Sequence, residues 1–158
     1  MTISYHGQDN FSIKTKGKTI EIGQKITLGG REIISPGEYE AGGVELEIID
    51  GIIEIYSEKM TIAWIKKGKI FSDTELEKLN GINVLLIGVG GGEFTETKTA
   101  IEVINQIEPA IAIPMYKNDL ESFLKEEGIS PTGLDQWKFS QADLSQDERK
   151  VVVLNVTR

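Results

Sequence analysis

The strongest constraint on the fold is a change in the hydrophobic pattern part-way along the chain. Up to Ile65, apolar residues alternate with polar ones, which is typical of half-buried β-strands. Glycines separate the runs, and the Asp50-Gly51 dipeptide is typical of a tight hairpin. The first half therefore predicts an antiparallel meander. Its apolar positions are Ile3 and Tyr5, Phe11 and Ile13, Ile20 and Ile22, Val44, Leu46 and Ile48, Ile53 and Ile55, and Ile62 and Trp64.

The second half instead alternates amphipathic stretches with continuous apolar runs. The run from Ile82 to Gly88 is nearly all apolar, which is typical of a strand covered on both faces. Possible helix caps are Ser72 or Asp73, Thr95 or Thr97, and Asn118. We expect a helix at 73–80, a strand at 82–88, a helix from Thr95 or Thr97 to Pro109, a strand at 110–113, a helix at 118–127 and a strand at 151–156.

Antiparallel strands followed by β-α-β units predict an α/β (α+β) fold. Two sheets would pack face to face, with helices on the outer faces. The chain has 158 residues, of which 39% are hydrophobic, enough for one sizeable core and too few for two ordinary domains. We therefore expect residues 1–158 to form a single domain.

Composition narrows the possible partners. The formal net charge of -8 argues against nucleic acid, whose phosphates require a basic surface. Lys14, Lys16 and Lys18 interrupt this acidic background and are interpreted as a solvated hairpin turn around Gly17. No stretch has the length and apolarity of a membrane span or a signal peptide. We expect a cytoplasmic protein without a membrane partner, and the absence of cysteine is compatible with a reducing compartment.

Histidine and cysteine are nearly absent, which limits catalysis and metal binding. His6 is the sole histidine, so a Ser-His-Asp triad would have to use it, and a zinc site built on several histidines is excluded. Its position near the end of the first predicted strand favours a structural or exposed role. Without cysteine there is no thiolate ligand either.

Two other patterns admit both a functional and a structural interpretation. Gly88-Val-Gly90-Gly91-Gly92 lies between a strand and a helix, where backbone amides can cradle a phosphate. Glu93 breaks the dinucleotide fingerprint and would repel phosphate, so a tight turn is the alternative. Glu38 and Glu40 would share one face of a strand, as a hard-cation site or simply as solvent-exposed side chains.

Three segments carry a resemblance to a known family. They are Ile34-Ser-Pro-Gly-Glu-Tyr-Glu-Ala-Gly-Gly-Val44, Val84-Leu-Leu-Ile-Gly-Val-Gly-Gly91, and Val103-Ile-Asn-Gln-Ile-Glu-Pro-Ala-Ile-Ala-Ile-Pro-Met115. In this order they resemble the metallo-β-lactamase-fold hydrolases, particularly the branch similar to ascorbate-phosphate lactonase and often labelled Zn-dependent hydrolase. The opening Tyr5-His-Gly-Gln-Asp-Asn-Phe11 is similar to that branch's first hairpin. The resemblance implies an αββα sandwich of metallo-β-lactamase type.

The metal-ligand positions of that family depart from its pattern. The family's His-x-His-x-Asp-His loop would fall between Ile22 and Ile33, where the chain has only about ten residues, so this αββα sandwich is truncated. Lys66-Lys67 stands where the resemblance implies the bridging aspartate. Tyr116 replaces the histidine after the Ile-Pro-Met strand, and Gln8 replaces the histidine of the opening motif.

These departures predict a degenerate, metal-free member of the family with no catalytic residue and no cofactor. The vacated site would bind a small anionic ligand or a protein partner, and a homo-oligomer is compatible with the deletion. Two alternatives stay open, a hydrolase of lactones or phosphodiesters with a rearranged hard-metal site, and nucleotide binding through the Gly88 to Gly92 turn. The candidate ligand-binding residues, expected to converge, are Gln8, Lys67, Gly90, Gly91 and Tyr116.

Overall fold

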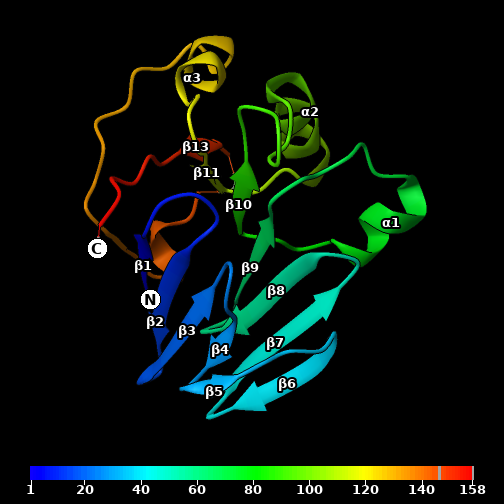
Figure 1. Ribbon diagram of the computed structural model, residues 1–158, viewed down its shortest axis with the longest axis vertical. Coiled ribbons are helices and arrows are strands. Elements are labelled where there is room, and N and C mark those ends of the chain that lie inside the picture. The colour runs from blue at the N-terminus through cyan, green and yellow to red at the C-terminus, as the bar shows by residue number, and fades with distance from the viewer. Residues whose placement is uncertain (146, 158) are drawn as a thin grey trace.

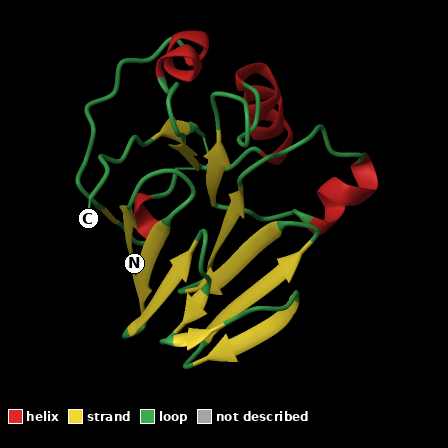
Figure 2. Cartoon of the chain, viewed as in Figure 1, coloured by secondary structure: helices red, strands yellow, loops and turns green. Residues whose placement is uncertain are grey.

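The computed structural model describes residues 1–145 and 147–157, which form two β-sheets packed face to face (Figures 1 and 2). The first sheet has the strand order β12-β1-β2-β3-β4-β5 and is antiparallel throughout. Its strands are β1 (Thr2–Tyr5), β2 (Phe11–Thr15), β3 (Lys18–Ile22), β4 (Thr27–Leu28), β5 (Arg31–Glu32) and β12 (Trp137–Lys138).

The second sheet is mixed and has the order β13-β11-β10-β9-β8-β7-β6. Its antiparallel part is β6 (Gly37–Ala41), β7 (Val44–Ile49), β8 (Ile52–Ser57) and β9 (Met60–Ile65). Parallel to β9 run β10 (Val84–Gly88), β11 (Ile111–Met115) and β13 (Lys150–Val151). Every residue of β10 and β11 is buried, as the continuous apolar runs predict.

The predicted hairpins are confirmed. Residues Lys16 and Gly17 connect β2 and β3, because Thr15 pairs with Lys18 across the turn. Asp50 and Gly51 connect β7 and β8 in the same way. Both turns place two successive residues at positive φ, the backbone conformation that tight hairpins require.

The helices are α1 (Asp73–Lys78), α2 (Thr97–Ile107), α3 (Glu121–Glu127) and the single 3-10 turn η1 (Gln141–Asp143). Ser72 caps α1 as predicted, in a capping box with Glu75. The other predicted caps are wrong. Glu96 and Leu120 are the N-cap residues of α2 and α3, and neither makes a side-chain capping bond. Thr95 instead donates its hydroxyl to the Lys66 carbonyl oxygen, and α3 starts beyond Asn118.

Two hydrophobic clusters lie on opposite faces of the second sheet. One fills the space between the sheets and contains Ile62, Trp64 and Leu86. The other lies under the helices, where Ile65 and Leu85 meet residues of α1, α2 and α3. The face of the first sheet that points away from the second carries polar residues, Ser4, Ser12, Lys14 and Glu21, none of which is buried.

The C-terminal segment departs from the predicted strand at 151–156. It leaves the second sheet after β13 and makes isolated bridges, Leu154 with Leu134 and Val156 with Tyr5. It therefore crosses from one sheet to the other, and a crossing segment cannot pair continuously with either. In the described residues, no helix is long and apolar enough to cross a membrane.

Candidate functional site

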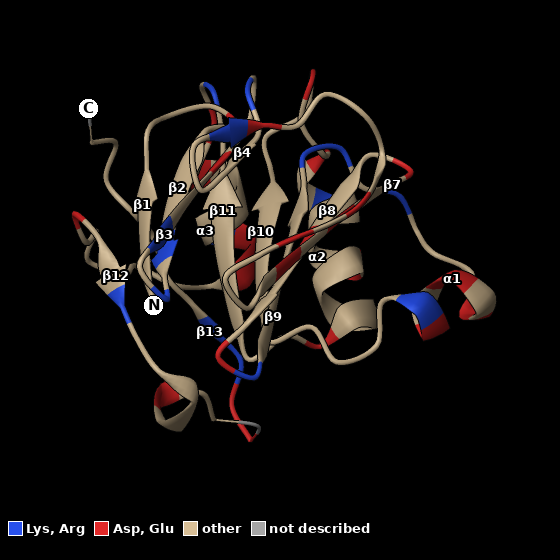
Figure 3. Ribbon diagram, turned by 90° about the horizontal axis from the view of Figure 1, so that it is seen from below, with Lys and Arg blue, Asp and Glu red and all other residues tan. Residues whose placement is uncertain are grey.

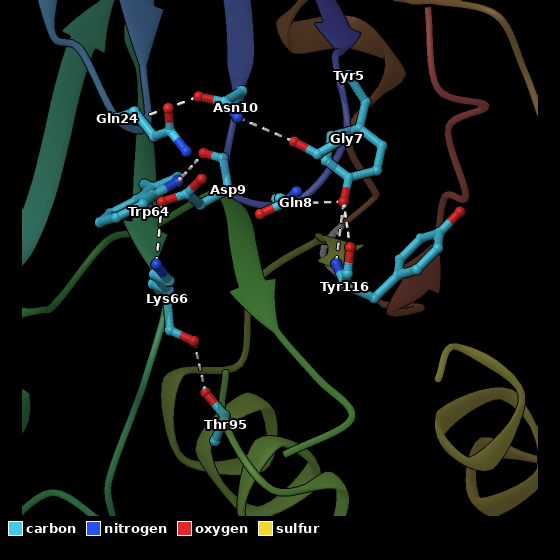
Figure 4. Close-up of polar contacts among 10 residues, drawn as sticks. All are labelled: Tyr5, Gly7, Gln8, Asp9, Asn10, Gln24, Trp64, Lys66, Thr95 and Tyr116. Carbon is cyan, nitrogen blue, oxygen red and sulfur yellow. Dashed lines mark hydrogen bonds and ion pairs between the residues drawn. The ribbon is translucent and has the colours of Figure 1, made fainter. Parts of the chain in front are cut away.

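The carboxyl ends of the parallel strands β9, β10 and β11 meet the loop that joins β1 to β2 (Figure 4). This edge of a parallel sheet is where ligands commonly bind in α/β folds. Residues His6 to Asn10 form the loop, with Gly7 and Gln8 at positive φ. Asp9 carries the loop's main contact with the second sheet, since the Trp64 Nε1 donates to the Asp9 carbonyl oxygen at 3.1 Å.

The side chain of Asp9 is buried and forms an ion pair. Asp9 is 6% exposed, and the Lys66 Nζ lies 3.1 Å from its Oδ2. The same ammonium lies 5.4 Å from the centre of the Phe94 ring, within the range of a cation–π contact. The edge therefore contains one buried negative charge with its own internal cation.

The backbone of Lys66 is fixed from two sides. Its carbonyl oxygen accepts hydrogen bonds from the Thr95 backbone N–H at 3.1 Å and from the Thr95 hydroxyl at 3.2 Å. The Gly68 N–H donates to the Thr95 Oγ1 at 2.8 Å. Gly88 lies so close that a Cβ there would overlap the Lys66 carbonyl oxygen. Lys66 is thus held where the buried β10 strand ends.

Tyr5 joins the first sheet to the end of β11. Its hydroxyl lies 2.7 Å from the Gln8 carbonyl oxygen and 2.9 Å from the Tyr116 carbonyl oxygen, and it accepts from the Tyr116 N–H at 3.0 Å. The centroids of the Tyr5 and Tyr116 rings are 5.7 Å apart. Burial raises the pKa of the Tyr5 hydroxyl far above its ordinary value. The hydroxyl therefore keeps its proton near neutral pH and acts through its hydrogen bonds.

The five predicted site residues fall into two groups. Gln8 and Tyr116 come together through the Tyr5 hydroxyl. Lys67 is exposed, and its Nζ donates to the Gly92 carbonyl oxygen at 2.9 Å, beside the glycine turn. Gly90 and Gly91 line an open groove of about 370 Å³ together with Phe94, Lys117 and Asp119. Their role in binding remains a prediction.

The structure also gives the glycine turn a structural explanation. A Cβ at Gly90 would lie 2.6 Å from the Asp119 carbonyl oxygen, so the close approach of two chain segments requires glycine there. The Gly91 N–H donates to the Thr95 carbonyl oxygen at 3.0 Å, which uses one of the amides that could otherwise face a phosphate.

Asp9, Lys66 and Trp64 were missed from sequence, although a signal was present. Ile62 and Trp64 belong to the cluster between the sheets, and Ala63 and Ile65 to the cluster under the helices. Continuing this alternation places Lys66 on the inter-sheet side, facing the first sheet. The family resemblance compares positions along the chain and so points to Lys67, whereas the alternation of the strand selects Lys66.

The residues at this edge do not fit a zinc centre, which requires several imidazole, thiolate or carboxylate donors around one ion. Asp9 is engaged by Lys66. His6 lies on the outward face of the first sheet, where its ring nitrogens contact the Thr157 carbonyl oxygen at 2.7 Å and the Ser12 hydroxyl at 2.8 Å. Among residues 1–145 and 147–157, no group of three His, Cys, Asp or Glu side chains is placed to hold a metal ion.

Glu38 and Glu40 do share one strand face, and three more glutamates lie beside them. Glu38 is opposite Glu47, which is opposite Glu54, and Glu40 is opposite Glu45. We call these five residues the acidic face; acidic segments are red in Figure 3. Burial, and then the charge of Glu47, raise the pKa of Glu54.

Comparisons with known proteins agree with this architecture. A family model described as a beta-lactamase superfamily domain matches residues 2–116. A candidate Zn-dependent hydrolase of the metallo-beta-lactamase superfamily from Thermotoga maritima has a TM-score of 0.79 at 22% identity, covering 98% of each chain. Igni18, a metallo hydrolase from the archaeon Ignicoccus hospitalis, has a TM-score of 0.63 at 11% identity, covering 88% of this chain and 99% of its own. No curated protein matches. These likenesses confirm the predicted fold class.

Proposed function

The chain belongs to the beta-lactamase superfamily, and we propose that it is a non-catalytic member of this family that acts as a binding or interaction module. The observation that supports this most directly is the Asp9–Lys66 ion pair, with the two atoms 3.1 Å apart at the carboxyl edge of the second sheet. A lysine ammonium beside the one buried carboxylate of this edge repels a metal ion instead of recruiting it.

The chemistry of the other side chains supports the same proposal. Metal-dependent hydrolases of this kind need an activated water, which in turn needs a metal held by several neutral imidazoles and carboxylates. The chain has one histidine and no cysteine, and His6 is engaged on the outward face. Within the family, the sequence motifs favour the branch similar to ascorbate-phosphate lactonase.

The proposed binding surface is the groove beside Lys67 and the glycine turn. Lys117 lines this groove together with Glu93 and Asp119, and the exposed Lys67 lies beside it through its bond to the Gly92 carbonyl oxygen. The Tyr116 side chain packs against Tyr5 at the same edge. This composition suits a small anion or an acidic segment of a partner. We propose that residues 1–158 act as one domain in the cytoplasm, and that a second copy can cover part of the edge.

Metal analysis and hydrolysis assays on the same preparation test the proposal. Protein purified without chelator should contain much less than one metal ion per chain and should not hydrolyse lactone or phosphodiester substrates. Stoichiometric metal, lost on chelation together with such activity, would overturn the proposal in favour of a rearranged hydrolase, which the descriptions of the similar structures make the second candidate.

The nucleotide alternative has a separate test. Calorimetric titration with ATP and with NAD should give no heat of binding, because the Gly91 N–H is already bonded to the Thr95 carbonyl oxygen and Glu93 breaks the dinucleotide fingerprint. Binding that is abolished by Lys67→Met would instead assign the groove to nucleotides.

A further inference from the structure

We infer that the ammonium of Lys66 is a built-in cation that holds the β1–β2 loop on the second sheet, at the edge where the family resemblance implies a metal centre. The same Asp9–Lys66 pair supports the proposed function, but a structural cation is compatible with any ligand or none, so the stability of the edge can be tested separately from binding and hydrolysis.

The Asp9 side chain is buried beneath the β1–β2 loop. Its side chain is 8% exposed, and a carboxylate removed from water needs a compensating charge or a set of hydrogen bonds. Among the described residues, Lys66 supplies the one ion pair and the one side-chain hydrogen bond that the Asp9 carboxylate makes. The loop can therefore stay buried with Asp9 ionised only while a cation is present.

Other contacts of the fold place the two partners. They are 57 positions apart in the chain, and Asp9 follows β1 of the first sheet whereas Lys66 follows β9 of the second. Trp64 fixes the Asp9 backbone, and Thr95 fixes the Lys66 backbone, so the pair forms without ordering either backbone. Preorganised partners lose little conformational entropy when they associate, unlike two long side chains on the surface.

A surface pair in the same chain shows the contrast. Lys25 and Glu32 are 3.9 Å apart, with side chains 62% and 57% exposed. Solvent screens such a pair, and it contributes little. Asp9 and Lys66 are closer and much less exposed, with Lys66 at 31%. The matched pair Lys25–Glu32 therefore serves as the internal control.

The test is a double-mutant cycle with Asp9→Asn and Lys66→Met in the full-length chain, followed by thermal unfolding in EDTA. At pH 7, Lys66→Met should lower the melting temperature by about 4 to 8 °C, because Asp9 is left buried without a cation. Adding Asp9→Asn should recover most of this loss, and Lys66→Arg should lose little. The same cycle at Lys25 and Glu32 should show changes within about 1 °C and no coupling.

Amide exchange in Lys66→Met separates a loop-holding cation from general packing. Amide exchange at His6 and Asn10, whose N–H groups bond within the loop, should rise about tenfold or more, while β10 amides keep their protection.

Several outcomes would overturn the inference. The first is that the changes in melting temperature caused by Asp9→Asn and Lys66→Met simply add in the double variant. The second is that the melting temperature of the wild type falls in EDTA or rises with 1 mM Zn²⁺. If Lys66→Met is too unstable to purify, the double variant decides, since a double variant that folds supports the pair and one that does not fold contradicts it. Hydrolase activity with an intact coupling would refute the proposed function alone.

Discussion

The carboxyl edge of the second sheet and the acidic face on β6 to β8 differ in whether their charges are paired. At the edge, the buried Asp9 has an ammonium 3.1 Å away. On the acidic face, five glutamates stand opposite one another, and none of them forms an ion pair among the described residues. A fully buried charge must be compensated, whereas like charges that solvent reaches at least in part are screened and cost little each. Tight packing and paired charge therefore mark the edge as the more constrained of the two regions.

The largest expected loss of stability comes from a substitution that crowds the backbone of the carboxyl edge. Gly88→Ala should destabilise the protein by about 3 kcal/mol or more, because the added Cβ overlaps the Lys66 carbonyl oxygen in a region that cannot shift easily. Urea unfolding measures the change. Gly91→Ala is the control, because open space surrounds that position and only its φ of +79° opposes alanine, at a cost of about 1 kcal/mol. Equal losses in the two variants would show that the edge is not crowded.

The next effect removes a polar contact from the edge. Tyr5→Phe should cost about 1 to 3 kcal/mol, because the Tyr116 N–H and the Gln8 carbonyl oxygen lose their shared partner. Tyr39→Phe should cost less than about 0.5 kcal/mol, since the Tyr39 hydroxyl bonds the Ser35 carbonyl oxygen at an exposed site. Similar losses in both variants would contradict the contrast between buried and exposed hydrogen bonds.

The same tyrosine predicts a pH dependence. Burial raises the folded-state pKa of Tyr5 above its unfolded value, so its contribution is fully present below about pH 10 and is lost as the pH rises through the folded-state pKa. The stability difference between the wild type and Tyr5→Phe should therefore shrink above pH 10. Urea unfolding at pH 8, 10 and 11 measures it, and a difference that grows with pH would show that the hydroxyl is not buried in solution.

The smallest effect lies on the acidic face and has the opposite sign. Glu54→Gln should stabilise the protein by about 0.5 kcal/mol at pH 7, because burial, and then the charge of Glu47, disfavour the ionised Glu54 carboxylate. The raised pKa of Glu54 means that its ionisation costs stability as the pH rises through that value, so the gain should vanish near pH 4. Glu77→Gln on α1 is the control and should leave the free energy of unfolding unchanged at both pH values. A loss of stability in Glu54→Gln at pH 7 would mean that the Glu54 carboxylate has a favourable contact.

Much of the fold could be predicted because its signals are local. Alternation of apolar residues identified β1, β2, β3, β7, β8 and β9, and continuous apolar runs identified β10 and β11, whereas β4, β5, β6 and β12 were not predicted. The turn residues Gly17 and Asp50-Gly51 identified the hairpins. Helix starts were less predictable. Thr95 looks like a cap in sequence, but its hydroxyl bonds the Lys66 carbonyl oxygen, a partner 29 positions away.

The sequence by itself determined that one chain cannot supply several histidines or any thiolate to a metal centre, because donor atoms are a matter of composition. It also determined the two-sheet architecture, since the hydrophobic periods decide which faces must be buried. Strand alternation places Lys66, and not Lys67, on the inter-sheet side, but only the tertiary structure decided that Lys66 meets a buried charge there. Asp9 and Lys66 meet through the packing of two sheets, and no local pattern records a contact between residues so far apart in the chain.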